Sequence, residues 1–213
     1  EMTDTMKLIL VDPIEELCDA FESAFSAFDS VEVHNGYFEE VPEYDCMVSA
    51  ANSFGIMDGG VDAAITKYFG RQLMARVQAR IIDEWSGEQP VGTSMIVETT
   101  HPDHPYLAHT PTMRYPMSIF RTDAVYNAMW AMLNAVKNFN KTAETPIDII
   151  ACPGLGTATG AVPYAEAARQ MALAYQNFRN PPQRISWLYA EARQRAIRFG
   201  GYYGYSVPME GEK

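Results

Sequence analysis

Residues 49–65 read SAANSFGIMDGGVDAAI, and this stretch decides the fold. The apolar run 46–48 leads into it and predicts a strand, and a helical pattern follows from Val61. Between the two lie Gly55 and the pair Gly59-Gly60. Glycines let the backbone approach a ligand closely, and a helix that begins just after them presents unpaired N–H groups and the positive end of its dipole. The stretch therefore predicts a ligand loop suited to phosphate.

A second loop of the same kind reads CPGLGTATGAVP over residues 152–163. It follows the β-branched run 147–151, which is typical of a buried parallel strand, and it precedes a helical segment at 164–178. Two strand–loop–helix units in one small domain predict two loops that grip one ligand from both sides. The Gly-Lys-Ser/Thr ending of a P-loop is absent, and the first strand is followed by Asp12-Pro13 instead of the glycines of a dinucleotide fingerprint.

Both loops resemble those of the macrodomain family. Residues 49–52, followed by 59–65, resemble the family's first ligand loop, whose usual pattern is Asn-Ala-Ala-Asn, a glycine run and Val-Asp at a helix start. Residues 153–160 are similar to the family's second, diphosphate-binding loop. The two motifs occur in the expected order, and the resemblance extends over roughly residues 7–178. It implies binding of ADP-ribose, and many members of the family hydrolyse ADP-ribose conjugates.

Alternating strands and helices predict a three-layer α/β/α sandwich with a central mixed, largely parallel sheet, and a ligand site at the carboxyl ends of the strands. We expect an N-terminal tail over residues 1–6, a macrodomain over 7–180, and a C-terminal helical extension and tail over 181–213. Further strands are expected at 7–11, 31–34, 94–98 and 106–109, and helices at 61–69, 71–82, 121–139 and 185–199. Residues 110–116 are expected to form a proline-bounded connection, and residues 200–205 a flexible aromatic tail.

The composition indicates a folded intracellular protein. Of 213 residues, 47% are hydrophobic and 20% are charged, which excludes a largely disordered chain. The formal net charge of -11 argues against non-specific nucleic-acid binding, which requires clustered Lys and Arg. No apolar stretch reaches the length of a membrane span, and the N-terminus lacks a signal-peptide pattern. We therefore expect a cytoplasmic protein with no membrane partner.

The cysteines and histidines give no metal-ligand pattern. Cys18, Cys46 and Cys152 lie in apolar or helical segments without Cys-x-x-Cys spacing, so buried reduced thiols are expected. His101 and His104 could form a metal clip, but the two prolines beside them favour a surface loop. The sequence therefore predicts no required metal and no cofactor.

The resemblance implies two catalytic residues and a set of ligand-binding residues. Asn52 is expected to orient the distal ribose, and Asp62, ten residues further on, to position or activate water. Ser49 replaces the first Asn of the usual pattern, and Asp58 stands where glycine is common and should point away from the phosphates or serve the ribose. The predicted ligand-binding residues are Ser53, Gly59, Gly60, Val61, Gly154, Leu155, Gly156, Thr157, Ala158, Thr159, Gly160 and Ala161, with Tyr37 and Phe38 beside the base.

The expected adenine contact departs from the family. Most macrodomains carry, at the position of Tyr37, an Asp that reads the adenine amine. We expect ring stacking by Phe38, by Tyr37 or by a tyrosine of the C-terminal tail, with weaker selection among bases. The alternative is that Phe38 is simply a core residue.

Two classes of function remain open. The first is an ADP-ribosyl hydrolase that acts on mono-ADP-ribosylated protein or on an O-acyl-ADP-ribose. The second is a non-catalytic reader or sensor of ADP-ribose or of a related NAD-derived nucleotide. The presence of Asp62 favours the enzyme.

Overall fold

The computed structural model describes residues 6–201, which form a six-stranded sheet with the strand order β2-β1-β6-β3-β5-β4. Neighbouring strands are parallel except for the antiparallel pair β4 and β5, so the predicted mixed, largely parallel sheet is confirmed. The strands are β1 (Lys7–Asp12), β2 (Val31–Asn35), β3 (Cys46–Asn52), β4 (Met95–Glu98), β5 (Tyr106–Met113) and β6 (Ile149–Cys152).

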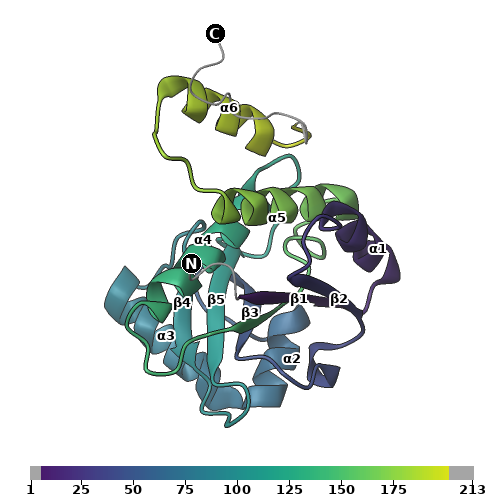
Figure 1. Ribbon diagram of the computed structural model, residues 1–213. Helices are drawn as coiled ribbons and strands as arrows, with labels where there is room; N and C mark the ends of the chain where they lie inside the picture. The colour runs from purple at the N-terminus through teal and green to yellow at the C-terminus, as the bar shows by residue number, and fades with distance from the viewer. Residues whose placement is uncertain (1–5, 202–213) are drawn as a thin grey trace.

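Helices cover both faces of this sheet, which makes the three-layer sandwich. The helices are α1 (Glu15–Ala24), α2 (Gly60–Phe69), α3 (Arg71–Trp85), α4 (Ala124–Asn140), α5 (Tyr164–Arg179) and α6 (Trp187–Ile197), with a short 3-10 helix η1 (Phe38–Glu40) after β2. In Figure 1, α1, α4 and α5 lie over one face, and α2 and α3 lie over the other. The fold class predicted from the alternation of elements is confirmed.

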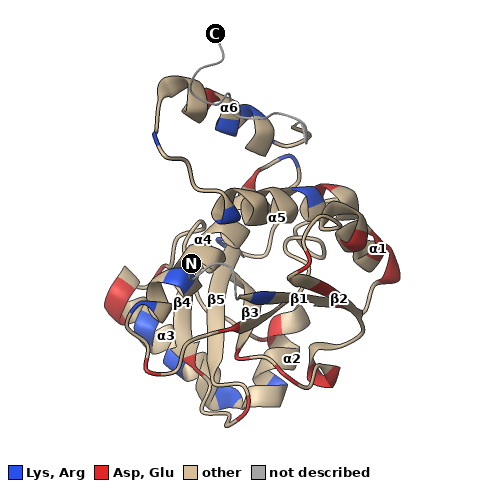
Figure 2. Cartoon of the chain, viewed as in Figure 1, with Lys and Arg blue, Asp and Glu red and all other residues tan. Residues whose placement is uncertain are grey.

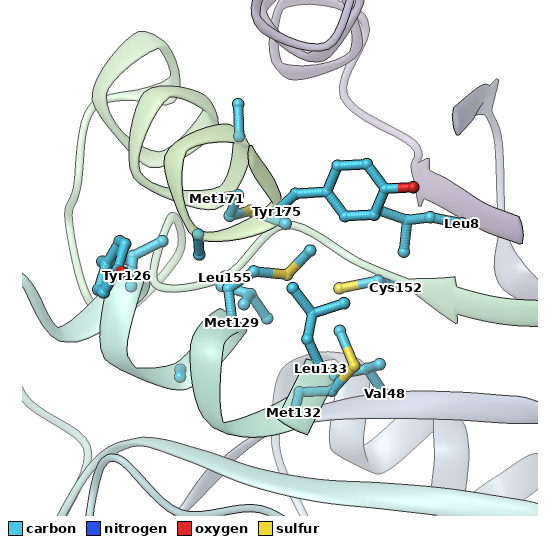
Figure 3. Close-up of a cluster of buried hydrophobic side chains, with 14 of the residues drawn as sticks. Leu8, Val48, Tyr126, Met129, Met132, Leu133, Cys152, Leu155, Met171 and Tyr175 are labelled. Carbon is cyan, nitrogen blue, oxygen red and sulfur yellow. The ribbon is translucent and has the colours of Figure 1, made fainter. Parts of the chain in front are cut away.

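The two hydrophobic cores follow from the strand pattern. Successive side chains of a strand point to opposite faces, so in β3 Val48 enters the core beneath α4 and α5, while Met47 enters the core beneath α2 and α3. Figure 3 shows the larger core, where Val48 and Cys152 of the sheet meet Met132 and Leu133 of α4. Buried on both faces, the central strands read as continuous apolar runs.

Strand β5 is longer than the sequence predicted. It runs past His109 and through Pro111 to Met113, where we had expected a connection, so that expectation was wrong. Strand β4 pairs with β5 only up to His109, so the missing N–H of Pro111 leaves no β4 partner unpaired. On the β3 side the register shifts between Ala51 and Asn52, an irregularity of the kind that accommodates proline in a sheet.

The loop between β4 and β5 is not wholly at the surface as predicted. The His104 side chain is buried, its ring stacks on Tyr44 with 3.7 Å between centroids, and its Nδ1 lies 2.8 Å from the Tyr44 carbonyl oxygen.

The three cysteines are buried and free, as predicted. Most of the aromatic tail expected at 200–205 lies outside the described residues. Within residues 6–201, none of the helices combines the length and apolar composition that a bilayer crossing requires.

The end of α6 is held on α5 by a largely buried polar network. Arg169 donates to the Glu166 carboxylate at 2.7 and 2.8 Å, and to the carbonyl oxygens of Ala196 at 2.7 Å and Arg198 at 2.9 Å. The Gly200 N–H donates to Glu166 at 2.9 Å. Carbonyl groups at the end of a helix lack intrahelical partners, so Arg169 satisfies the end of α6. The predicted boundary at residue 180 falls between α5 and α6.

We expect Arg169→Met to lower the free energy of unfolding by about 3 kcal/mol, because it leaves the largely buried Glu166 carboxylate without its cation and the carbonyls of α6 without donors. Urea unfolding followed by circular dichroism measures this. The control is Arg195→Met, which removes an exposed ion pair with Glu191 and should cost under about 1 kcal/mol. Equal losses in the two variants would contradict a stabilising role for the buried network.

Candidate functional site

A pocket of about 560 Å³ lies at the carboxyl ends of the parallel strands. The residues that line it come from the carboxyl-terminal parts of the parallel strands and the segments that follow them: 11–14 at the end of β1, 36–39 after β2, 47–64 from β3 into α2, 112–116 at the end of β5, and 153–160 after β6. Parallel strands bring their carboxyl ends to one edge of the sheet, so loops far apart in the sequence meet there. Both glycine loops of the sequence analysis line this one pocket.

The second glycine loop presents a row of unpaired donors. The N–H groups of residues 156–160 donate to no protein acceptor in the described part of the chain. The row of unpaired donors ends before Ala161. The Ala161 N–H donates to the Ala158 carbonyl at 3.0 Å, and the Val162 N–H donates to the Gly156 carbonyl at 3.0 Å. Gly156 has a φ of 71°, a backbone conformation that favours glycine. The loop is a concave set of backbone donors of the kind that binds anions.

The first glycine loop brings a second set of donors to the same pocket. The first intrahelical bond of α2 joins the Ala63 N–H to the Gly59 carbonyl at 3.2 Å, so the N–H groups of residues 60–62 precede it and have no intrahelical partner. Gly60 has a φ of 56°, which places the chain in the left-handed region at the helix start. Gly59, Gly60 and Val61 all line the pocket.

Asn52 lines the pocket and also organises the first loop. Its Oδ1 accepts from the N–H groups of Phe54 at 3.1 Å and Ile56 at 3.3 Å, and its Nδ2 donates to the Ile56 carbonyl at 2.9 Å. These bonds fix the turn that follows β3. One hydrogen of Nδ2 is left for a ligand.

Asp62 lines the pocket from the first turn of α2 and is almost fully buried, with 4% of its surface exposed. Its Oδ1 accepts from the Ser49 hydroxyl at 2.6 Å. Burial raises the pKa of Asp62 from 3.8 to about 7, and the bond from Ser49 opposes this rise. Within residues 6–201, Oδ2 has no hydrogen-bond partner, so it is the oxygen available to a ligand or to water.

The raised pKa of Asp62 makes the stability of the protein depend on pH. The folded state favours the protonated carboxyl. The stability that Asp62 contributes is therefore fully present below about pH 4 and is lost as the pH rises through about 7. One pKa unit corresponds to about 1.4 kcal/mol, so the loss amounts to a few kcal/mol. We expect Asp62→Asn, measured by urea unfolding from pH 4 to 8, to lose less stability than the wild type as the pH rises.

The control for this measurement is Asp83→Asn, which removes an exposed carboxylate from α3 and should keep the wild-type pH dependence. If Asp62→Asn and the wild type lose stability in parallel between pH 4 and 8, Asp62 does not prefer its protonated form in the folded protein.

His109 is a second buried titratable group beneath the site. It lies opposite Ser49 in the register of β5 and β3. Its Nδ1 is 2.6 Å from Gln89 Oε1, and because an amide oxygen only accepts, Nδ1 carries the proton of the neutral ring. Burial lowers the pKa of His109 to about 3, so the ring is neutral at physiological pH.

The charges around the pocket are negative. The lining includes the carboxylates Asp12, Glu39, Asp58 and Asp62 and, among the described residues, no lysine or arginine. Asp12 accepts from the Ile14 N–H at 3.0 Å through one oxygen and from the Gly154 N–H at 3.3 Å through the other. In Figure 2, acidic residues gather on α1 and basic residues on α3. An anion in this pocket therefore depends on backbone donors and helix dipoles.

The structure brings most of the predicted ligand residues together, but three lie outside the pocket lining. Ser53 and Leu155 are buried, and Ala161 uses its N–H within its own loop. Tyr37 and Phe38 both line the pocket. The Tyr37 side chain is 61% exposed, whereas Phe38 is 5% exposed.

Sequence reasoning missed two parts of the lining. The first is Asp12, Pro13 and Ile14, at and just after the end of β1, and the second is Met113 and Pro116, at and just after the end of β5. The rule that ligands lie beyond the carboxyl ends of parallel strands could have found the first part, because the strand ending near Asp12 was predicted. The second part was hidden by the wrong end assigned to β5.

The fold and the paired glycine loops define an α/β protein with a pocket lined by backbone donors at the ends of its parallel strands. The family model described as Macro domain matches residues 48–171. The chain belongs to the macrodomain family.

Individual relatives are distant. An uncharacterized protein of Aquifex aeolicus is 29% identical over 66% of this chain and 78% of its own. The macrodomain of Mycobacterium tuberculosis DarG is 16% identical, with a TM-score of 0.55 over 68% of this chain and 88% of its own. A mutant Oceanobacillus iheyensis macrodomain solved with ADP-ribose is 19% identical, with a TM-score of 0.58 over 84% of this chain and 81% of its own. At these identities the structures establish the shared fold.

Proposed function

We propose that this chain binds ADP-ribose in the pocket, with the diphosphate on the unpaired N–H groups of residues 156–160 and of the first turn of α2. The observation that carries the proposal is the meeting of two sets of backbone donors in one pocket whose described lining has no cationic side chain. Helix N-termini and glycine loops bind phosphate in this way. The relative from Oceanobacillus iheyensis was solved with ADP-ribose and, in another structure, with ADP.

The two ends of the pocket suit the two ends of this ligand. In the sheet, β1 and β2 lie on one side of β6, and β3 lies on the other. We therefore assign the adenine to the side lined by Ile14, Tyr37 and Phe38, and the distal ribose to the side lined by Asn52. The exposed Tyr37 ring is free to stack on the base, whereas Phe38 packs edge-on against Tyr68 with 5.6 Å between ring centroids. Stacking selects weakly among bases, so guanosine and inosine analogues should compete.

We further propose that the protein hydrolyses ADP-ribose conjugates, namely mono-ADP-ribosylated protein or O-acyl-ADP-ribose, which derive from NAD. Water held by Asp62 Oδ2 attacks C1″ of the distal ribose and gives its proton to that oxygen. The C1″–O bond breaks as the new one forms, and the leaving carboxylate keeps the bonding electrons. An oxocarbenium-like centre needs only a modest base. A pKa of about 7 keeps Asp62 partly ionised at neutral pH, near the optimum for a general base.

The second candidate function is a non-catalytic reader of ADP-ribose. The observation in its favour is that Asp62 is almost fully buried and bonded to Ser49, so its carboxylate also serves to join α2 to β3. A purely structural Asp62 would leave the pocket with its backbone donors for binding but without the base assigned above.

Calorimetry with ADP-ribose followed by a release assay on glutamate-linked ADP-ribosylated protein separates these functions. Binding together with release supports the hydrolase. Binding without release from carboxylate-linked, serine-linked or O-acetyl substrates replaces the hydrolase with the reader. Failure of ADP-ribose to bind overturns both.

A further inference from the structure

The bond between Ser49 and Asp62 connects the middle of β3 to the first turn of α2, directly under the pocket. Ser49 has no exposed surface, and its Oγ lies 2.6 Å from Asp62 Oδ1. An ionised carboxylate only accepts, so the hydroxyl is the donor. Because Oδ1 is held by the strand, Oδ2 is the oxygen left toward the pocket.

We propose that Ser49 is a positioning residue, which fixes the Asp62 carboxylate so that Oδ2 holds the attacking water and which stabilises the ionised form of that carboxylate. The proposal rests on the hydrolase function proposed above. Ser49 itself touches no substrate: it is absent from the pocket lining, and it acts only through the bond to Oδ1.

Two physical effects follow from this geometry. First, a buried hydrogen bond to one oxygen removes the rotation that would otherwise exchange the two oxygens of Asp62 at the pocket. Second, a donor that bonds the ionised form stabilises it against the cost of burial. Burial and the Ser49 bond are the two opposing causes that set the pKa of Asp62. In a variant that lacks the Ser49 hydroxyl, burial alone acts on the pKa of Asp62 and raises it further.

Among residues 6–201, charged groups do not contribute to the pKa shift of this carboxylate beside Ser49. Lys67 lies near the other end of α2, Asp58 lies in the loop before it, and the neutral His109 lies on β5 opposite Ser49. None of them is among the causes of the Asp62 shift, and neither are the ionisable residues of the neighbouring α3. Those residues are Arg71, Arg76, Arg80, Asp83 and Glu84.

The test is the pH profile of kcat for release of ADP-ribose from glutamate-linked protein. We expect Ser49→Ala to move the acidic limb of the profile upward by about one pH unit, and so to lower kcat at pH 6 about tenfold relative to the wild type. Affinity for ADP-ribose, measured by calorimetry, should change less than about threefold, because the lost bond serves the base and not the ligand.

Two further variants separate positioning from mere packing. Ser49→Thr keeps the hydroxyl, and its β-branched side chain suits a strand, so it should restore the wild-type limb. Thr110→Val removes another fully buried hydroxyl, on the neighbouring β5, that bonds Ser94 and not Asp62. Thr110→Val should therefore not move the acidic limb of the pH profile of kcat.

The outcomes distinguish this inference from the function on which it rests. A wild-type protein that releases no ADP-ribose overturns the hydrolase and with it any positioning role of Ser49. An active wild type whose acidic limb is unchanged in Ser49→Ala, or is moved equally by Thr110→Val, overturns the role of Ser49 alone.

Discussion

Asp62→Asn is expected to lose at least about 10²-fold in kcat while binding ADP-ribose nearly as tightly as the wild type. Asparagine keeps the shape of the side chain and an oxygen to accept the Ser49 hydroxyl, so the buried contact at 2.6 Å can persist. An amide cannot take a proton from water. A loss confined to kcat is the signature of an interaction expressed mainly in the transition state.

The matched control is Asp58→Asn, which removes an exposed carboxylate from the same loop and the same pocket. It should retain turnover, and it should bind the anionic ligand no more weakly than the wild type, because a like charge is removed. Single-turnover release measures the rates, and calorimetry measures the affinities. If Asp62→Asn retains wild-type turnover, the carboxylate is structural and another group activates the water.

The wild-type profile of kcat should fall as the pH drops through about 7, because protonation of Asp62 removes the base. The same protonation favours the folded state. Activity and the contribution of Asp62 to stability therefore change in opposite directions with pH. This opposition is expected where a carboxylate is buried for function and its neutral form would be more stable.

The fold could be predicted because its signals are local. Apolar runs, glycine loops and helical patterns marked the central strands, and the order of the elements predicted the parallel sheet. The two glycine loops predicted which strands carry the ligand, because parallel strands place those loops at one edge. At Pro111 the local signal predicted a connection where β5 continues. The reason is a tertiary contact: the pairing of β4 with β5 ends before Pro111, so the proline fits in the strand.

The contacts inside the site could not be predicted, because they join residues that only the fold brings together. The sequence marked Ser49 as a departure from the family pattern, but its bond to Asp62 spans thirteen positions and depends on how α2 packs against β3. Asp12 reaches Gly154 from the other end of the chain for the same reason. Neither pairing leaves a periodic or spacing signal in one sequence.

Gly160→Val is expected to weaken ADP-ribose binding by about 10²-fold or more without unfolding the protein. A Cβ at Gly160 would lie 2.5 Å from the carbonyl oxygen of Gly156 and 2.9 Å from its carbonyl carbon. These are backbone atoms of the same loop, so the loop must open, and the N–H groups of residues 156–160 then diverge. A hydrogen bond to a charged group contributes about 1.5–3 kcal/mol, so the loss of two suffices for this effect.

Gly160 tests the diphosphate loop more cleanly than Gly156, where a Cβ would lie 2.8 Å from Ile119 Cδ1 and 2.9 Å from Val125 Cγ2 and would disturb the core as well. Thermal unfolding with and without ADP-ribose checks both fold and binding. The control is Gly59→Ala, whose added methyl would have no atom of the described residues within 4 Å beyond its chain neighbours. A loss of affinity in this variant therefore reports a contact with the ligand and not a distorted loop. Wild-type affinity in a folded Gly160→Val would remove the diphosphate from this loop.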